Sequence, residues 1–277
     1  PRARAKTKVA TQAHPFELTI FFDFIGPIHR GSHSQEYIPM LWLNDRKYFW
    51  LNPVRSRHAD SFVSILDEAR THWNVKEIPY VLRSDRETLT TSIDLNDYLK
   101  ATGGRPEFGI PYNSNSNSIA EQRCRLVQEC LVATLHQSAM PKAYWPDALQ
   151  HWCAEWNLNN GLKPLTNTIA SEIVFGQLGY ACLPRLNPIL GKKESFRLNP
   201  RRYPVAFLGR DLRSSGAIWV LYRKPHVTQG RYSRLSIKFA DVNWEPTYAF
   251  HETLKDLSWI RDFDLSGEIS RGREDPK

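Results

Sequence analysis

The sequence has no long hydrophobic run: in its 277 residues no apolar stretch approaches the roughly twenty residues that a membrane-spanning helix needs. No secretory signal is visible either. The four cysteines include no Cys-x-x-Cys pair, and His151 with Cys153 is too little for a zinc site. We therefore read Cys124, Cys130, Cys153 and Cys182 as reduced thiols of an intracellular globular protein, and we expect no membrane partner.

Acidic residues are outnumbered by basic ones, 29 against 37, which gives a net charge of +8 and a calculated pI near 9.3. Such a balance favours polyanionic partners. The excess is concentrated in residues 191–238, which hold twelve Lys and Arg against two acids, and in a basic start over residues 1–14. Phosphate binding and an ordinary solvated surface both remain open for the 191–238 segment.

The order of apolar segments predicts the fold. Strand candidates at 17–25, 37–43 and 47–54 are followed by a helical face from Ala59 to Trp73 and a fourth strand at 78–84. Gly103, Gly104 and Pro106 are expected to close a short helix, with a further apolar piece at 108–112. A long helix then begins near Ser118, and another carries Trp145, Trp152 and Trp156. The order βββαβαβα is typical of a ribonuclease H-like α/β fold, a mixed five-stranded sheet with flanking helices.

The remainder of the chain predicts a second, smaller unit. Strand candidates at 203–208, 217–222 and 235–242 indicate a small β-rich module, and 170–175 is expected to form a short helix before it. The expected organisation is a flexible basic arm over 1–14, a ribonuclease H-like core over 15–165 and a connector over 166–190. A β-rich module over 191–250 and a mixed-charge tail over 251–277 complete it.

Three acids stand at chemically informative places. Asp23 lies inside an apolar strand, where an isolated charge must be paired, protonated or bound to a cation. Asp85 ends the fourth strand, and Glu121, thirty-five residues further on, falls in the first turn of the long helix. A glutamate there also stabilises the helix through its dipole, which is the structural alternative. Three converging carboxylates could instead hold two divalent metal ions.

These residues resemble those of a known family, the integrases of copia-type retrotransposons within the retroviral-integrase-like superfamily. The resemblance covers roughly Leu18 to Trp244. Its matching pieces, in order, are Asp23 to Pro27, Leu82 to Asp85, Pro111 to Glu121, Met140 to Trp145 and Val205 to Gly209. The last piece resembles the strand that opens the family's C-terminal part, which implies that the β-rich module is barrel-like.

The resemblance implies a function and its components. Asp23, Asp85 and Glu121 would be the catalytic metal ligands for Mg²⁺ or Mn²⁺, two ions per active site. The expected reaction is strand transfer of retroelement cDNA 3′ ends into target DNA by a homo-oligomer, in the nucleus, with a cytoplasmic particle or polyprotein at other stages. A His/Cys zinc module upstream in the polyprotein is also implied, so the chain is expected to be a fragment. The expected DNA contacts are Lys192, Lys193, Arg197, Arg201, Arg202 and Arg123.

The sequence also departs from the family pattern. The family has a glycine shortly after its second aspartate, and this glycine is lost here, where the chain reads Arg86, Glu87 and Thr88. Ser118 replaces the family's glycine before the glutamate. Gln122 stands where a basic residue is usual, with Arg123 one step later. Two alternatives follow: a decayed or host-retained protein that binds nucleic acid or protein without joining activity, and a nuclease that hydrolyses without joining.

Overall fold

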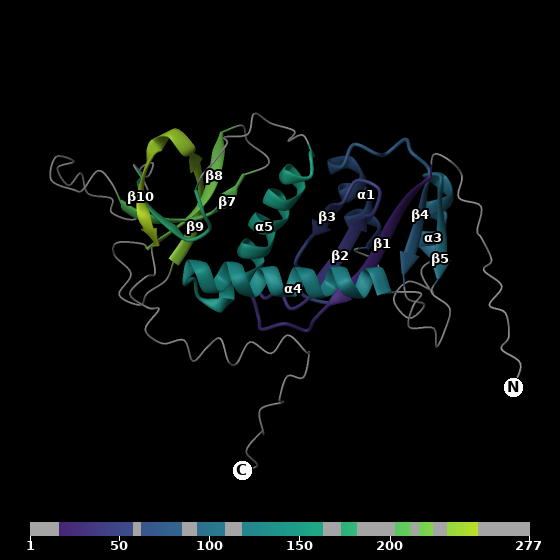
Figure 1. Cartoon of the computed structure of the whole chain (residues 1–277), viewed down its shortest axis with the longest axis horizontal. Helices are drawn as coiled ribbons and strands as arrows, with labels where there is room; N and C mark the ends of the chain where they lie inside the picture. The colour runs from purple at the N-terminus through teal and green to yellow at the C-terminus, as the bar shows by residue number, and fades with distance from the viewer. Residues whose placement is uncertain are drawn as a thin grey trace, which may run out of the picture.

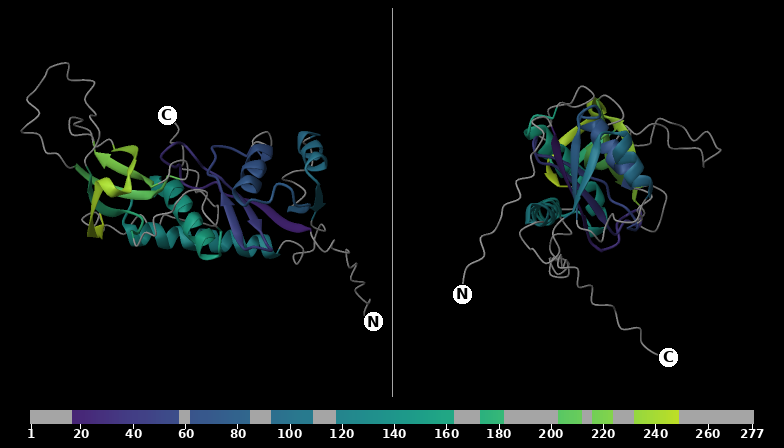
Figure 2. Two further views of the ribbon diagram at one scale, coloured as in Figure 1. Left: turned by 90° about the horizontal axis from the view of Figure 1, so that it is seen from above. Right: turned by 90° about the vertical axis from the view of Figure 1, so that its right-hand side faces the viewer.

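The computed structural model describes residues 17–57, 62–84, 93–108, 118–162, 173–181, 203–211, 216–223 and 232–248. Two sheets stand at opposite ends of this part of the chain, with two long helices packed between and beneath them (Figure 1). A view from above shows the same separation of the sheets (Figure 2). No helix in the described ranges combines the length and the apolar character needed to cross a membrane.

The first sheet has the strand order β3-β2-β1-β4-β5. Its strands are β1 (Leu18–Ile25), β2 (Ile38–Leu43), β3 (Tyr48–Leu51), β4 (Tyr80–Ser84) and β5 (Gly104–Phe108). The first three form an antiparallel meander, while β4 and β5 run parallel to β1. This mixed sheet confirms the predicted ribonuclease H-like α/β fold.

Helices cover both faces of the first sheet because β1 alternates between two buried sides. Ile20 and Phe22 pack on the face covered by α1 (Phe62–His72) and α3 (Ile93–Ala101). Phe21 and Ile25 pack on the opposite face, against α4 (Ser118–Ser138) and α5 (Trp145–Asn159). A short 3-10 turn, η2 (Lys142–Tyr144), precedes α5. The predicted start of α4 near Ser118 is therefore confirmed.

Strand β5 corrects one expectation. Gly103, Gly104 and Pro106 were expected to end a helix before a strand at 108–112, but the strand itself runs Gly104–Phe108. A Cβ atom on Gly104 would lie 2.5 Å from Cζ of Tyr80. Glycine at this position therefore lets β5 approach β4, so the residue marks close packing rather than a loop.

The second sheet has the order β10-β6-β7-β8-β9, and all of its pairings are antiparallel. Its strands are β6 (Gln177–Ala181), β7 (Tyr203–Arg210), β8 (Ala217–Arg223), β9 (Tyr232–Lys238) and β10 (Val242–Tyr248). The strand expected at 235–242 is wrong, because the 3-10 turn η3 (Phe239–Asp241) separates β9 from β10. Residues 173–175, the described part of the helix expected at 170–175, are not helical.

The second sheet is not a separate module joined by a simple connector. Strand β6 lies inside the segment 166–190 that was expected to be a connector, and it pairs with both β7 and β10. Ala206, Leu208 and Leu221 of this sheet belong to the same buried cluster as α4, α5 and the near face of the first sheet. The two sheets therefore share a hydrophobic core, which fixes the second sheet on α5.

Candidate active site

Asp23 lies on the face of β1 that is covered by α4. It shares this side of the strand with Phe21 and Ile25, and its register partner on β2 is Met40. The carboxylate is partly buried, and its Oδ1 accepts a hydrogen bond of 2.7 Å from the backbone N–H of Phe24. A charged side chain on a strand face that otherwise carries large apolar residues needs such polar contacts.

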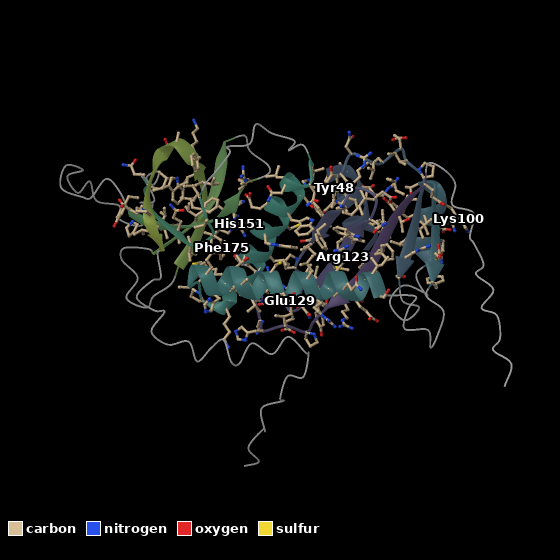
Figure 3. All side chains as sticks on the ribbon, viewed as in Figure 1. Tyr48, Lys100, Arg123, Glu129, His151 and Phe175 are labelled. Atoms are coloured by element: carbon tan, nitrogen blue, oxygen red, sulfur yellow. The ribbon has the colours of Figure 1, made fainter. Side chains whose placement is uncertain are left out.

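Helix α4 brings a second carboxylate towards the same place. Glu121 is exposed in the first turn of α4, and Cys124, three residues later, lies on the same side of the helix. The Cys124 thiol donates to Oδ2 of Asp23 at 3.6 Å and also approaches Sδ of Met40 at 3.8 Å. Figure 3 shows the neighbouring Arg123 on the sheet side of α4.

The pKa of the Cys124 thiol is affected by both carboxylates. Burial raises the pKa of the Cys124 thiol most, followed by the charge of Asp23, its hydrogen bond with Asp23, and the charge of Glu121. Asp23, on β1, therefore acts directly on this partly buried thiol, and the charge of Glu121, on α4, adds a smaller effect. Negative charges near a thiol disfavour the thiolate, so both carboxylates shift the pKa of Cys124 in the same direction.

Asp85, the third acid, lies outside the described residues. Strand β4 ends at Ser84, directly before it, and pairs in parallel with β1 through registers that reach Phe21 and Arg83. The expectation that β1 and the strand before Asp85 are adjacent is thus met. The position of Asp85 itself stays a prediction.

The donors that are described suit a hard divalent cation. Carboxylate oxygens are the ligands that Mg²⁺ prefers, and Asp23 and Glu121 supply them. Within the described ranges, no group of three or more His, Cys, Asp or Glu side chains is gathered as a metal site. A complete set would thus need an acid beyond those ranges, which is where Asp85 lies.

The expected DNA contacts divide into two groups. Lys192, Lys193, Arg197, Arg201 and Arg202 lie outside the described residues. Arg123 is half-buried, with its guanidinium carbon 4.5 Å from the centre of the Trp42 ring. That cation–π contact holds the side chain against β2, and its role towards DNA stays a prediction.

Cys124 is the residue of this site that sequence reasoning missed. The signal was its spacing from Glu121, since residues three apart on a helix share one side. A cysteine at that spacing, on a helix whose Glu121 was expected to converge with Asp23, could have been placed next to the aspartate.

Comparison with known proteins gives the following. No family model matches the chain. It is 26% identical over 164 residues to the Pro-Pol polyprotein of Simian foamy virus type 3 (strain LK3), covering 58% of this chain and 13% of that polyprotein. It is 26% identical over 140 residues to the Retrovirus-related Pol polyprotein from transposon TNT 1-94 of Nicotiana tabacum, covering 46% and 10% respectively.

Solved structures show weaker likenesses. A simian T-cell lymphotropic virus intasome in complex with PP2A regulatory subunit B56 gamma aligns with a TM-score of 0.41 and 14% identity, covering 83% of this chain and 78% of that one. The catalytic core domain of BIV integrase aligns with a TM-score of 0.37 and 17% identity, covering 48% and 78%.

The chain spans only 10% to 13% of the length of the Pol polyproteins it matches. Within that span, sequence similarity to Pol polyproteins accompanies a ribonuclease H-like sheet with an acid on its first strand. The chain is thus similar in sequence to a part of the Pol polyproteins of foamy viruses and of a plant transposon, in agreement with the integrase-like resemblance expected from the sequence.

Proposed function

We propose that this chain is a copia-type retrotransposon integrase, which joins the 3′ ends of element cDNA to target DNA by metal-dependent strand transfer. The observation that carries the proposal is the contact between Asp23 on β1 and Cys124 on α4, which packs the first turn of α4, with Glu121, beside the strand of Asp23. Two carboxylates on separate elements, beside the end of a strand that leads to a third acid, are what a divalent-metal site requires.

Each acid has a proposed role. Asp23, Asp85 and Glu121 would hold Mg²⁺ or Mn²⁺, two ions per site. Bound there, these ions would lower the pKa of an attacking hydroxyl and neutralise charge on the phosphorus. Asp23 is oriented for this role by the Phe24 N–H on Oδ1, while Glu121 is exposed to solvent.

The proposed reaction forms one phosphorus–oxygen bond and breaks another. The 3′-hydroxyl oxygen of a cDNA end forms a bond to a target phosphorus, and the bond from that phosphorus to the target strand's 3′ oxygen breaks. The hydroxyl proton is lost to solvent, and the released 3′ oxygen is protonated. Because one phosphodiester replaces another, no external energy source is needed.

The remaining parts of the proposal concern partners. The proposed partners are retroelement cDNA ends, target DNA and further copies of this chain, since joining two ends in concert needs two active sites. The basic residues Lys192, Lys193, Arg197, Arg201 and Arg202, with Arg123, are proposed to contact DNA. The proposed place of action is the nucleus.

One observation favours a second function. The Cys124 thiol donates to Oδ2 of Asp23, an oxygen that a metal ligand must present to the cation. Together with the altered residues 86–88, this contact favours a decayed or host-retained protein that binds nucleic acid or protein without joining.

A strand-transfer assay separates these functions. Purified protein is incubated with labelled duplex ends and a target plasmid, with Mg²⁺, with Mn²⁺ or with EDTA. An integrase gives joined products with either metal, none with EDTA, and none when the ends carry 3′-deoxy termini. Cleavage that does not depend on the 3′-hydroxyl would indicate a hydrolytic nuclease. A lack of products with both metals would favour the non-catalytic protein.

A further inference from the structure

The loop between β1 and β2 and the chain after β3 form an exposed basic surface. It consists of Arg30 and His33 in the loop and Arg55 and Arg57 after β3, and we call these four residues the basic loop surface. All four side chains are exposed. The loop leaves β1 at Ile25, two residues beyond Asp23, so this surface begins at the same end of β1 as the candidate active site (Figure 1).

The arginines of this surface keep their charge available. Arg30 donates to Oγ of Ser34 at 3.0 Å, Arg55 to the carbonyl of His33 at 3.2 Å, and Arg57 to the carbonyl of Gly26 at 2.6 Å. Every one of these acceptors is uncharged. Among the described residues, none of the three guanidinium groups forms an ion pair with a carboxylate.

Four other arginines of the described chain behave differently. Arg83, Arg105, Arg210 and Arg234 each lie within 3.1 Å of an Asp or Glu oxygen. The fold thus neutralises those arginines internally. Among the described residues, Arg30, Arg55 and Arg57 have no such carboxylate partner, so their charges can attract an external anion.

The backbone holds the basic loop surface in place. Ile28 N–H donates to the carbonyl of Glu36 at 2.7 Å, and Gly31 N–H donates to the carbonyl of Gln35 at 2.8 Å. The loop is also fixed to η2 and to the start of α5, because Ser32 N–H donates to the carbonyl of Ala143 at 2.6 Å and Trp145 Nε1–H to that of His29. A charged surface held this way loses little conformational entropy on binding.

Arg57 also has a fixed position. Its guanidinium carbon lies 5.0 Å from the centre of the Tyr37 ring and 5.7 Å from that of Phe24, the neighbour of Asp23 in sequence. Arginine offers planar, bidentate donors that suit phosphate oxygens. Asp23 and Glu121 would repel a phosphate backbone, so a cationic surface beside them provides attraction that does not require a bound metal.

We infer that the basic loop surface binds the phosphate backbone of duplex DNA next to the candidate active site, independently of sequence and of divalent metal. This inference rests on the proposed function for the identity of the polyanion. It adds a contact region formed by the first sheet, distinct from the segment 191–238.

The test is duplex binding in EDTA, measured by fluorescence anisotropy over a series of salt concentrations. The test variant is Arg30→Gln/Arg55→Gln/Arg57→Gln. The control variant is Arg46→Gln/Lys76→Gln/Lys100→Gln, which removes the same charge from exposed positions in the turn between β2 and β3, the turn after α1 and the end of α3. These turns adjoin the opposite end of the parallel strands.

We expect the salt slope of log K to fall by about 0.9 for each phosphate that the variant no longer neutralises, so by up to about 2.7 in the test variant. The control variant should keep most of the wild-type slope. Equal decreases in both variants would mean that only net charge matters, and would overturn the inference. An unchanged slope in the test variant, or wild-type protein that does not bind duplex DNA, would overturn it too.

Two further variants keep the result decisive. Arg30→Lys/Arg55→Lys/Arg57→Lys retains the charge and should restore most of the slope; failure to do so would contradict phosphate binding at these positions. Asp23→Asn should lose joining while keeping the full slope. Wild type that joins DNA ends, together with an unchanged slope in the test variant, would refute this inference alone. Wild type that does not join DNA ends, together with a reduced slope in the test variant, would refute the proposed function alone.

Discussion

The Cys124 thiol lies 3.6 Å from Oδ2 of Asp23 and links helix α4 to strand β1 at the candidate active site. This contact sets how far Glu121, one helical turn earlier, stands from the strand. The thiol lies among acids and apolar side chains, and both keep it protonated.

Alkylation should therefore distinguish the folded state from the unfolded state at Cys124. Because thiolate is the reactive form and the pKa of Cys124 is raised, labelling by iodoacetamide at pH 8 should be more than about tenfold slower in native protein than in urea. Mass spectrometry of the Cys124 peptide measures this. The buried Cys153, whose pKa is raised to about 12, is the internal reference for protection. Fast native labelling of Cys124 would contradict the described contact.

Gly26 should not tolerate a side chain. Its φ is +121°, and an added Cβ would lie 2.7 Å from the carbonyl oxygen of Glu36. Gly26→Ala should lower the free energy of unfolding by about 1–3 kcal/mol, the cost of a strained backbone position. Gly161→Ala is the matched control, since φ there is also positive, +89°, but no atom lies within 4 Å of the added Cβ. Equal decreases in urea titrations of the two variants would show that the Glu36 contact is unimportant.

His151 should make stability sensitive to mild acid. Burial against the second sheet lowers its pKa to about 4, with Arg210 contributing, and its ring packs near Phe175 and Phe207 (Figure 3). The unfolded chain protonates this group below its ordinary pKa of about 6.5, whereas the folded chain does not. Its contribution is therefore present above about pH 6.5 and is lost as pH falls towards 4.

Between pH 7 and pH 5 this loss amounts to at most about 2 kcal/mol. Thermal melting at both pH values checks it: His151→Leu should show a smaller drop in Tm than wild type. His136→Leu, at an exposed position on α4, is the control and should leave the drop unchanged. A drop of the same size in His151→Leu would mean that His151 is not held neutral.

The pair formed by Asp147 and Arg234 should be costly to break. Nη1 of Arg234, on β9, lies 2.9 Å from Oδ1 of Asp147, on α5, and the Asp147 side chain is only 3% exposed. Arg234→Met would leave a buried charge without its partner and should cost about 3–5 kcal/mol. The exposed pair of Lys76 and Asp67 gives the control, as Lys76→Met should cost at most about 1 kcal/mol. Denaturant titration that finds similar small decreases would contradict a buried pair.

The first sheet could be predicted from sequence because its signals are local. Strands β1 to β4 and helices α1, α4 and α5 each carry an apolar period that fits one kind of element. The position of β5 was predicted wrongly because Gly104 and Pro106 are typical turn residues. Only the close approach of the Tyr80 ring explains why a glycine is needed at position 104. Strand β6 contains Gly179 and has a weak signal of its own. Its pairing with β7 and β10 depends on contacts far along the chain.

The site was predicted in outline for a similar reason. Asp23 stands out because a charge in an apolar strand is exceptional, and Glu121 because it opens a long helix. Cys124 was missed although its spacing from Glu121 offered a signal, and the basic loop surface was missed because scattered arginines do not indicate in sequence which residues they lie beside. The fold brings Arg30, Arg55 and Arg57 together through the meander of β1 to β3.

The most direct test of the proposed function is strand transfer by wild type, Asp23→Asn and Glu121→Gln, with thermal melting in Mg²⁺ and in EDTA. If these acids hold the metal ions, wild type joins DNA ends and melts higher with Mg²⁺, while both variants lose joining and the Mg²⁺-dependent rise yet remain folded. If Glu121 serves only the helix dipole, Glu121→Gln should lower stability by about 0.3–1 kcal/mol and leave joining intact. Wild type that neither joins DNA ends nor responds to Mg²⁺ would contradict the proposal.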